Sequence, residues 1–342
     1  MSFERRDVDR KILSILKVLQ KHQDPIGGRL IGQELKDHGV ALSERAVRYH
    51  LKIMDERGLT ALMGNQDGRM ITEKGLAEIR SALVKDKVGF AITKIELLAF
   101  RTTFDYRTGI GNVPLNVSFF AKPAFDRALA AMQPAFDRGF CVSRLVALAE
   151  SGQRIGDLVV PEGQVGFGTV CSIVINGALL KAGIPMDSRF SGTLQLSGGK
   201  PTRFTEIIHY NGCSLDPSEI FIKARMTSVT ETIATGGGEV LANFREIPAI
   251  CVPLVDTVLD GLKSAGISGV IAKGEPSEAV CETAVEPNKV GLVLIGGLNP
   301  VAAAQEIGIE AENHSMSTVV DYKDLILVSE LIGESRKSDP MP

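Results

Sequence analysis

Three cationic side chains are spaced along residues 43–57 so that a helix would present them on one side. Arg45, Arg48 and Lys52 lie three and four residues apart. Tyr49 lies beside them. A guanidinium group can bind O6 and N7 of a guanine together, and an ammonium group suits a phosphate oxygen. The spacing therefore favours a helix that reads the major groove of DNA. The alternative is an ordinary solvated helix face.

The segments around this helix have the order of a winged helix-turn-helix. Apolar spacing predicts helices over residues 7–22, 30–37 and 43–57, followed by strands at 59–63 and 69–72 with a turn at 65–68 between them. We expect residues 1–80 to form a DNA-binding domain, in which Ser43 caps the third helix and Arg69 lies on the wing. A winged helix that contacts protein or RNA is the alternative. The expected DNA-binding residues are Ser43, Arg45, Arg48, Tyr49, Lys52 and Arg69.

Charge is distributed unevenly along the 342 residues. The whole chain has a formal net charge of −3. Residues 1–80 hold fifteen Lys and Arg against twelve Asp and Glu, whereas the remainder holds twenty-three against twenty-nine. A basic start on an acidic body is consistent with a small DNA-reading module attached to a larger domain that does not touch phosphate.

Several classes of protein do not fit this sequence. No apolar run is long enough to span a membrane and the first residues do not resemble a signal peptide, so we expect a cytoplasmic protein. The five cysteines, at 141, 171, 213, 251 and 281, are scattered singly, which favours buried thiols in a reducing compartment over a disulfide framework or a metal site. No G-x-S-x-G, P-loop or H-E-x-x-H motif is present, and the only histidines beyond residue 80 are His209 and His314. We therefore expect neither an enzyme nor a cofactor or metal site.

The rest of the chain has the pattern of an internal duplication. Stretches that begin at Val165 and Val290 each run through an apolar strand to an asparagine, and Asn116 and Asn243 form a further matching pair. The offset between the copies stays at 125 to 127 residues. Because strand and helix patterns alternate within each copy, we predict a duplicated α/β sandwich as a regulatory domain over residues 85–330. Its two pseudo-symmetric lobes would be 85–196 and 230–330, and the fold class α+β multidomain.

The segment between the lobes, about residues 196–229, has no counterpart in the repeat. Gly198-Gly199 and Asn211-Gly212 predict turns, the second being a strong hairpin signal. Asp216-Pro217 predicts a helix start with Asp216 as its cap. Such a segment could complete a lobe, cover a ligand or form a dimer contact. The polar tail, residues 334–342, is expected to be disordered.

The expected DNA-binding domain (residues 1–80, the head) and the expected regulatory domain together resemble the NrpR family, the nitrogen-regulatory repressors of methanogenic archaea. The likeness extends from about residue 7 to residue 327. It is carried by residues 40–59 and by the runs Gly109-Ile110-Gly111-Asn112-Val113-Pro114 with Asn116, Gly183-Ile184-Pro185, Arg203-Phe204, Tyr210-Asn211-Gly212-Cys213-Ser214-Leu215-Asp216-Pro217 and Gly296-Gly297-Leu298-Asn299-Pro300.

The resemblance implies a function as well as a fold. In the family the head binds a palindromic operator at nitrogen-assimilation promoters and represses transcription, and the regulatory domain senses 2-oxoglutarate, which releases the DNA. A palindrome implies a homodimer or a higher assembly. Some members carry two regulatory domains per chain and this sequence has one, so a second NrpR-type protein would be a further partner. The alternatives are a co-regulator, a metabolite-responsive regulator of other genes, and a small-molecule enzyme with an appended winged helix.

A dicarboxylate effector restricts where it can bind, because it needs cations, hydroxyls or clustered backbone amides at both ends. Arg189 and Arg203 are the cations nearest the segment between the lobes. Gly296-Gly297 follows a strand and precedes a helix, where backbone amides favour an anion. We expect 2-oxoglutarate in the crevice between the lobes or at a dimer seam, although each arginine alone is better explained as a surface charge. The expected effector-binding residues are Arg189, Ser191, Arg203, Ser214, Gly296 and Gly297.

Overall fold

The computed structural model describes residues 3–22, 24–37, 40, 42–63, 68–81 and 89–331. The chain divides into two compact units, Met1–Val88 and Gly89–Pro342. The tail predicted at 334–342 and most of the turn predicted at 65–68 lie outside the described residues. Of the helices that are described, none has the length and apolarity needed to cross a bilayer.

The first unit is a winged helix. Its elements are α1 (Phe3–Gln20), α2 (Gly28–Asp37), α3 (Glu44–Glu56), β1 (Thr60–Leu62), β2 (Arg69–Ile71) and α4 (Glu73–Ser81). Leu16 of α1, Ile31 of α2 and Leu51 of α3 are fully buried and pack in one core. Ser43 caps α3 as predicted, because its hydroxyl accepts from the Ala46 amide at 3.2 Å.

One carboxylate at the end of α3 holds both strands of the wing. Asp55 accepts a hydrogen bond from the Thr60 hydroxyl of β1 at 2.5 Å and one from Arg69 Nε of β2 at 2.8 Å. The two strands also pair with each other, Thr60 with Ile71 and Leu62 with Arg69. The carboxylate therefore fixes the whole hairpin against the helix. Charge-assisted hydrogen bonds of this kind are stronger than neutral ones.

The second unit repeats one set of elements twice. The first set is β3 (Asn112–Ala121), α7 (Phe125–Asp137), β4 (Leu145–Glu150), β7 (Gln164–Val170), α8 (Ile173–Lys181) and β8 (Asp187–Ser197). The second set is β10 (Gly238–Pro248), α11 (Val252–Ser264), β11 (Val270–Lys273), β12 (Lys289–Ile295), α12 (Asn299–Glu306) and β13 (Ala311–Asp321). Elements outside the repeat are α6 (Phe90–Arg101), β5 (Arg154–Ile155), β6 (Leu158–Val159), β9 (Lys200–His209), α9 (Pro217–Lys223), α10 (Val229–Thr235) and β14 (Ile326–Leu327).

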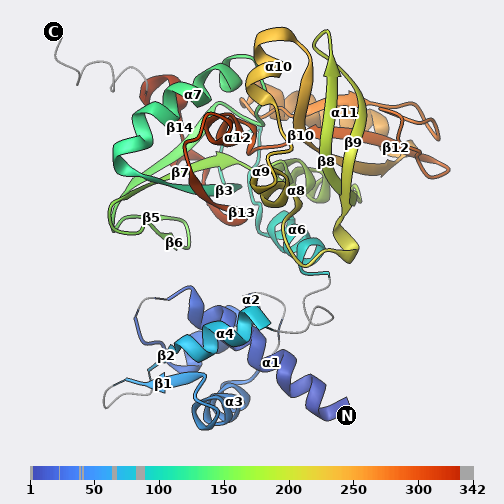
Figure 1. Ribbon diagram of the computed structural model, residues 1–342. Coiled ribbons are helices and arrows are strands. Elements are labelled where there is room, and N and C mark those ends of the chain that lie inside the picture. Colours follow the sequence, from blue (N-terminus) through green and yellow to red (C-terminus); the bar gives the residue numbers. More distant parts are fainter. Residues whose placement is uncertain are drawn as a thin grey trace, which may run out of the picture. The chain divides into compact units, whose positions relative to one another are not determined.

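The two repeats exchange their last strands. One five-stranded sheet has the order β11-β12-β10-β8-β9 and the other has the order β13-β3-β7-β4-β14. Strand β8 of the first repeat thus pairs with β10 of the second, and β13 of the second pairs with β3 of the first. Figure 1 shows the yellow-green β8 beside β10 and the red β13 beside β3. The lobes expected at 85–196 and 230–330 therefore correspond to the two sequence repeats. Each sheet contains strands of both repeats.

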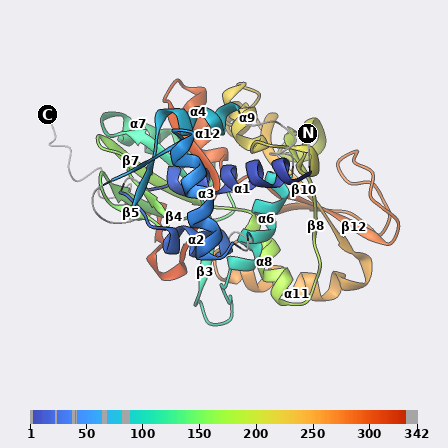
Figure 2. The same ribbon diagram turned by 90° about the horizontal axis from the view of Figure 1, so that it is seen from below.

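The helices also pair between repeats. Helix α7 packs against α12, and α8 packs against α11 and α6. Figure 2 shows α8 between α6 and α11. Gly177 of α8 permits the close approach of α6, since a Cβ there would lie 2.4 Å from Thr102 Cβ. The α+β fold class, a winged helix followed by a duplicated regulatory domain with two antiparallel sheets, is confirmed.

The segment between the repeats departs from the sequence prediction at one turn. Strands β8 and β9 form a hairpin around Gly198-Gly199, as expected. The hairpin predicted at Asn211-Gly212 is wrong, because Tyr210–Gly212 forms a short 3-10 helix instead. The buried Tyr210 draws this turn toward the core, where its hydroxyl donates to Asn243 Oδ1 at 2.5 Å. Asp216 caps α9 as predicted and accepts from the amides of Ser218 and Glu219.

The exchange predicts that one repeat does not fold alone. A fragment of residues 89–197 lacks β10 beside β8 and β13 beside β3, so it exposes long unpaired strand edges. We expect residues 89–331 to unfold in one cooperative transition by circular dichroism in urea, and 89–197 to show none as a monomer. A monomeric 89–197 fragment with a sharp transition would contradict the exchange.

The wing predicts a local effect of Asp55→Ala. Without the carboxylate, Thr60 and Arg69 lose their common acceptor, and the wing opens more easily. Hydrogen exchange by mass spectrometry should show β1 and β2 amides exchanging about fivefold faster, from a loss of about 1 kcal/mol. Glu56→Ala is the matched control, because it removes the same charge one residue later in the helix. Equal exchange rates in the two variants would show that Asp55 does not anchor the wing.

Candidate functional site

The outer face of α3 carries the four side chains that the sequence placed there. Arg45, Arg48, Tyr49 and Lys52 are all exposed, and Tyr49 is 60% accessible. Arg48 forms an ion pair with Glu44 one turn earlier at 2.8 Å. Its stem crosses the start of α2, where a Cβ on Gly28 would lie 3.2 Å from Arg48 Cγ. The face is therefore cationic, aromatic and accessible, as base and phosphate contacts require.

The other two residues of the expected DNA-binding set have internal partners. The Ser43 hydroxyl is occupied as the cap of α3. The Arg69 side chain is only 16% exposed and forms an ion pair with Asp55. These two residues hold the recognition helix and the wing in place, whereas the residues of α3 face outward.

The expected effector-binding residues do not converge on one place. Arg203 is exposed on the edge strand β9, and its Nε donates to Gln195 Oε1 at 3.0 Å. Ser214 is half-buried between the Tyr210–Gly212 turn and α9. Ser191 is buried on β8 opposite Asn243, and its hydroxyl donates to the Ala242 carbonyl at 3.3 Å.

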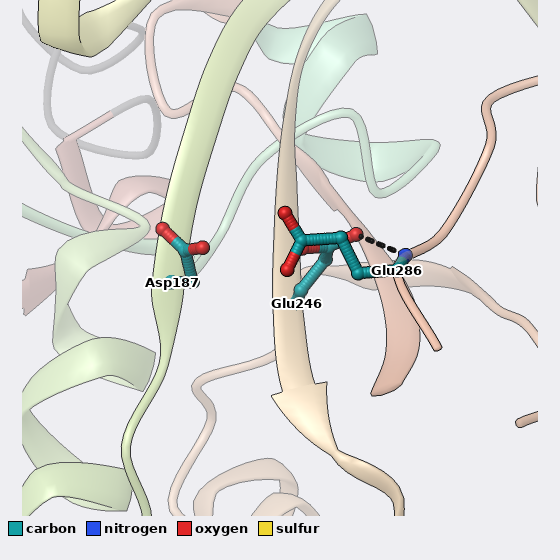
Figure 3. Close-up of side chains that lie close together, drawn as sticks. All are labelled: Asp187, Glu246 and Glu286. Atoms are coloured by element: carbon teal, nitrogen blue, oxygen red, sulfur yellow. Dashed lines mark hydrogen bonds between the residues drawn. The ribbon is translucent and has the colours of Figure 1, made fainter. Parts of the chain in front are cut away.

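Arg189 is committed to a cluster of carboxylates. It contacts Asp187 at 3.1 Å, Glu286 at 2.8 Å and Glu246 at 3.6 Å. The three acidic side chains come close together, as Figure 3 shows, and each offers a carboxylate oxygen within 4.8 Å of the others. The Glu286 amide also donates to Glu246 Oε1 at 3.0 Å. An arginine held in this way has little capacity left for a ligand carboxylate.

Two cations already occupy the positions a metal ion would take in this cluster. Lys289 contacts Glu286 at 2.7 Å and Glu246 at 3.4 Å, and Arg189 contacts the same two residues. The hydrogen bond from Lys289, followed by the one from Arg189, lowers the pKa of Glu286. Two fixed cations among three carboxylates make this an ion-pair network that ties β8, β10 and β12 together, and the donor set does not favour a metal.

Gly296 and Gly297 lie on a pocket where the two repeats meet. Its walls come from corresponding positions of both repeats: Asn116 with Asn243 on the central strands, and Cys171-Ser172 with Gly296-Gly297 at the strand-to-helix junctions. A Cβ on Gly297 would lie 2.5 Å from the Val170 carbonyl, so glycine is required for this approach. The pocket encloses about 20 Å³, which is room for one water molecule.

Arg245 brings a buried cation to this pocket, and the sequence analysis missed it. The residue is 1% exposed on β10, and its guanidinium lies 5.0 Å from the centre of the Tyr210 ring. Nη1 donates to the Phe244 carbonyl at 3.3 Å, and Nε has no partner among the described residues. Within that part of the chain, no carboxylate forms an ion pair with Arg245. Its counterpart in the first repeat is Ser118. The pocket walls therefore come from matching positions of the two repeats, except that Arg245 has no matching cation.

The polar groups beside Arg245 are neutral or already satisfied. Burial raises the pKa of Tyr210, which keeps its hydroxyl protonated as a donor to Asn243. Asn243 Nδ2 in turn donates to Ser172 Oγ at 3.3 Å. The Asp216 carboxylate also lines the pocket, but it is engaged in capping α9. The arrangement suits an anion, because a buried guanidinium whose Nε lacks a partner among the described residues gains most from a charged acceptor.

The cysteines are free, as the sequence predicts. Cys141, Cys171 and Cys213 are buried, and Cys251 and Cys281 are half-buried. Burial raises the pKa of Cys141 to about 12 and that of Cys171, which lines the pocket, to about 11. These thiols are therefore protonated at neutral pH and are poor nucleophiles.

Comparison with known proteins accounts for both units. Residues 88–326 match the family model of the NrpR regulatory domains NRD1 and 2. Residues 13–79 match the model of the ribonuclease R winged-helix domain. The likeness to the NrpR family inferred from the sequence is thus confirmed over most of the chain.

The relatives are named as regulators. The chain is 38% identical over 318 residues to the global nitrogen regulator NrpRI of Methanosarcina mazei, covering 93% of this chain and 98% of that protein. It is 34% identical to the global nitrogen regulator NrpR of Methanocaldococcus jannaschii over 93% of this chain and 55% of the relative, so it spans about half of that longer protein.

A solved structure agrees with these relatives. The crystal structure of a nitrogen repressor-like protein from Methanococcus jannaschii superposes with a TM-score of 0.60 at 27% identity, over 70% of this chain and 98% of that one. Regulators rather than enzymes are what the sequence led us to expect. A family model that covers most of the chain, and a relative matched along nearly its whole length, show that this chain belongs to the NrpR family of nitrogen regulators.

Proposed function

We propose that this protein is a transcriptional repressor of nitrogen-assimilation genes whose hold on DNA is relieved by 2-oxoglutarate. The observation that carries the DNA-binding part is the exposed cationic face of α3 in the recognition position of a winged helix. Arg45 and Arg48 would contact guanine edges, Tyr49 and Lys52 the backbone, and Ser43 and Arg69 would position the helix and the wing. The names of the relatives support nitrogen metabolism as the regulated process.

The assembly that fits this function is a homodimer on a palindromic operator. A two-fold dimer meets two half-sites about one helical turn apart with the same side chains from each copy. Residues 1–80 are net basic, whereas the remainder of the chain is net acidic. DNA contacts would therefore be confined to the winged helices. A cytoplasmic location and a second NrpR-type partner are parts of the same proposal.

The pocket at Arg245 is the best-supported place for 2-oxoglutarate. It combines the predicted Gly296 and Gly297 with a buried guanidinium that has no carboxylate partner in the described chain. Arg189 and Arg203, by contrast, are bonded to other side chains away from this pocket. At about 20 Å³ the pocket must open to admit a dicarboxylate, and such an opening is what an effector needs in order to change the protein.

DNA binding is tested by removing single cations from α3. Arg48→Ala and Arg45→Ala should each weaken binding to an operator fragment by roughly 1–3 kcal/mol and relax sequence preference, if each reads a base. Lys52→Ala should weaken all sequences alike and reduce the salt dependence. Fluorescence anisotropy at two salt concentrations gives these affinities, with promoter fragments of nitrogen-assimilation genes as the DNA.

Arg127→Ala on α7 is the matched control, because it removes another exposed arginine, from the regulatory unit. RNA of the same sequence serves as a competitor, since the winged-helix model that matches the head is named for a ribonuclease. Operator affinity that is unchanged in all three α3 variants, or preference for the RNA, would rule out the proposed interface.

The effector site is tested with Arg245→Met, which removes the guanidinium but keeps much of the volume. Titration calorimetry should show 2-oxoglutarate affinity falling by about ten- to a hundredfold, the effect of losing a charge-assisted hydrogen bond. Arg203→Ala is the control and should bind normally. Thermal unfolding followed by circular dichroism confirms that each variant is folded. Normal binding by Arg245→Met together with loss of binding by Arg203→Ala would return the effector to the position first expected from the sequence.

A further inference from the structure

One wall of the pocket is an irregular segment of β13. His314 pairs with Val117 of β3, but the next paired residue, Thr318, lies opposite Leu115, so β13 uses four residues where β3 uses two. Ser315 and Met316 of this bulge line the pocket. Met316 has a φ of +49°, a conformation that is strained for a side chain of its size.

The bulge is not reproduced at the same position in the other repeat. Its counterpart on β8 is Ser191, which stays in regular register opposite Asn243 of β10. The shift in β8 falls instead between the pairs of Phe244 and Arg245. Bulges that break a repeated pattern beside a binding site commonly re-aim the chain there.

Three different elements hold the bulge in place. The Ser315 amide donates to Glu219 Oε1 of α9 at 2.7 Å, and the Met316 amide donates to Asn116 Oδ1 of β3 at 3.0 Å. The Ser315 carbonyl accepts from Lys94 Nζ of α6 at 2.6 Å. Hydrogen bonds to the two amides and to the Ser315 carbonyl therefore hold the strained backbone in place.

Of these three partners, α6 is the one nearest to the winged helix along the chain. It begins at Phe90, and it is the first element described after α4, which ends at Ser81. Its other face packs on α8, whose first residue, Ile173, also lines the pocket. Lys94 is exposed and its stem is flexible, so a small displacement of the bulge can be followed by the side chain, whereas a larger one strains the hydrogen bond or moves α6.

We propose that Lys94 couples occupancy of the pocket to operator binding. This inference rests on the proposed function, and it makes Lys94 a positioning residue that need not touch the effector. A ligand larger than one water molecule displaces Ser315 and Met316, and the hydrogen bond from Lys94 transmits that displacement to α6. The bulge is the two-state element that both binding events bias, which is the physical requirement for coupling.

The test separates effector binding from its consequence. Titration calorimetry measures 2-oxoglutarate affinity, and anisotropy measures operator affinity with and without saturating 2-oxoglutarate. Lys94→Met should bind 2-oxoglutarate in the absence of DNA, and the operator in the absence of 2-oxoglutarate, with affinities within about threefold of those of the original chain. The factor by which 2-oxoglutarate weakens operator binding should fall by at least about threefold, within the range of a single residue's influence on coupling.

Two further variants sharpen the comparison. Lys94→Arg retains a cationic donor and should restore most of the coupling factor. Lys122→Met is the matched control, because Lys122 is an exposed lysine of the same unit that forms an ion pair with Glu150 at 2.7 Å. It should leave all three measurements unchanged.

The outcomes that overturn the inference are distinct from failure of the proposed function. If Lys94→Met responds to 2-oxoglutarate as fully as the original chain, Lys94 does not couple the sites, although the proposed function stands. If Lys94→Met loses effector affinity itself, Lys94 acts on effector binding, directly or through the charge of Asp216, and the positioning role is wrong. If the unaltered chain shows no effect of 2-oxoglutarate on operator binding, the proposed function fails and the inference fails with it.

Discussion

The last strand of each repeat, β8 or β13, hydrogen-bonds to the first strand of the other repeat, β10 or β3. Backbone groups on a strand edge must be paired or solvated, so each sheet is complete only when both repeats are present. The exchange makes the regulatory unit one body with a seam through its middle. Corresponding residues of the two repeats, such as Asn116 and Asn243, meet along that seam. The pocket lies there because the fold brings duplicated polar positions together.

Duplication alone would give a symmetric and uncharged pocket. The difference arises at Arg245, where the first repeat has Ser118, and in the β9–α9 segment, which supplies Tyr210 and Asp216. Burying a guanidinium without a carboxylate partner is unfavourable, and the aromatic face of Tyr210 offsets only part of that cost. Arg189 shows the opposite arrangement, since three carboxylates satisfy it. The contrast between these two arginines is the electrostatic basis for placing the effector at Arg245.

Local signals in the sequence were sufficient for the head and for the caps. Ser43 and Asp216 begin helices because each supplies an oxygen to free amides within a few residues. The repeat was also visible, since the offset between copies is nearly constant. The exchange of β8 and β13 was not, because a repeated pattern reads the same whichever sheet its last strand joins. The partners of Arg189 could not be foreseen for a similar reason: the carboxylates at 246 and 286 are 57 and 97 residues away in sequence. Arg245 leaves only a weak signal in the sequence, because Glu239 and Glu246 are charged residues of the same strand.

In the proposed mechanism, operator and effector favour different conformations of the same protein. Thermodynamic linkage then requires reciprocity: the factor by which 2-oxoglutarate weakens operator binding must equal the factor by which operator weakens 2-oxoglutarate binding. The direct measurement is calorimetric titration of 2-oxoglutarate into the full chain, free and saturated with operator DNA, beside anisotropy titrations of the operator with and without the acid. We expect two equal factors, both well above one. Equal affinity of 2-oxoglutarate for the free and the DNA-bound protein would contradict the account.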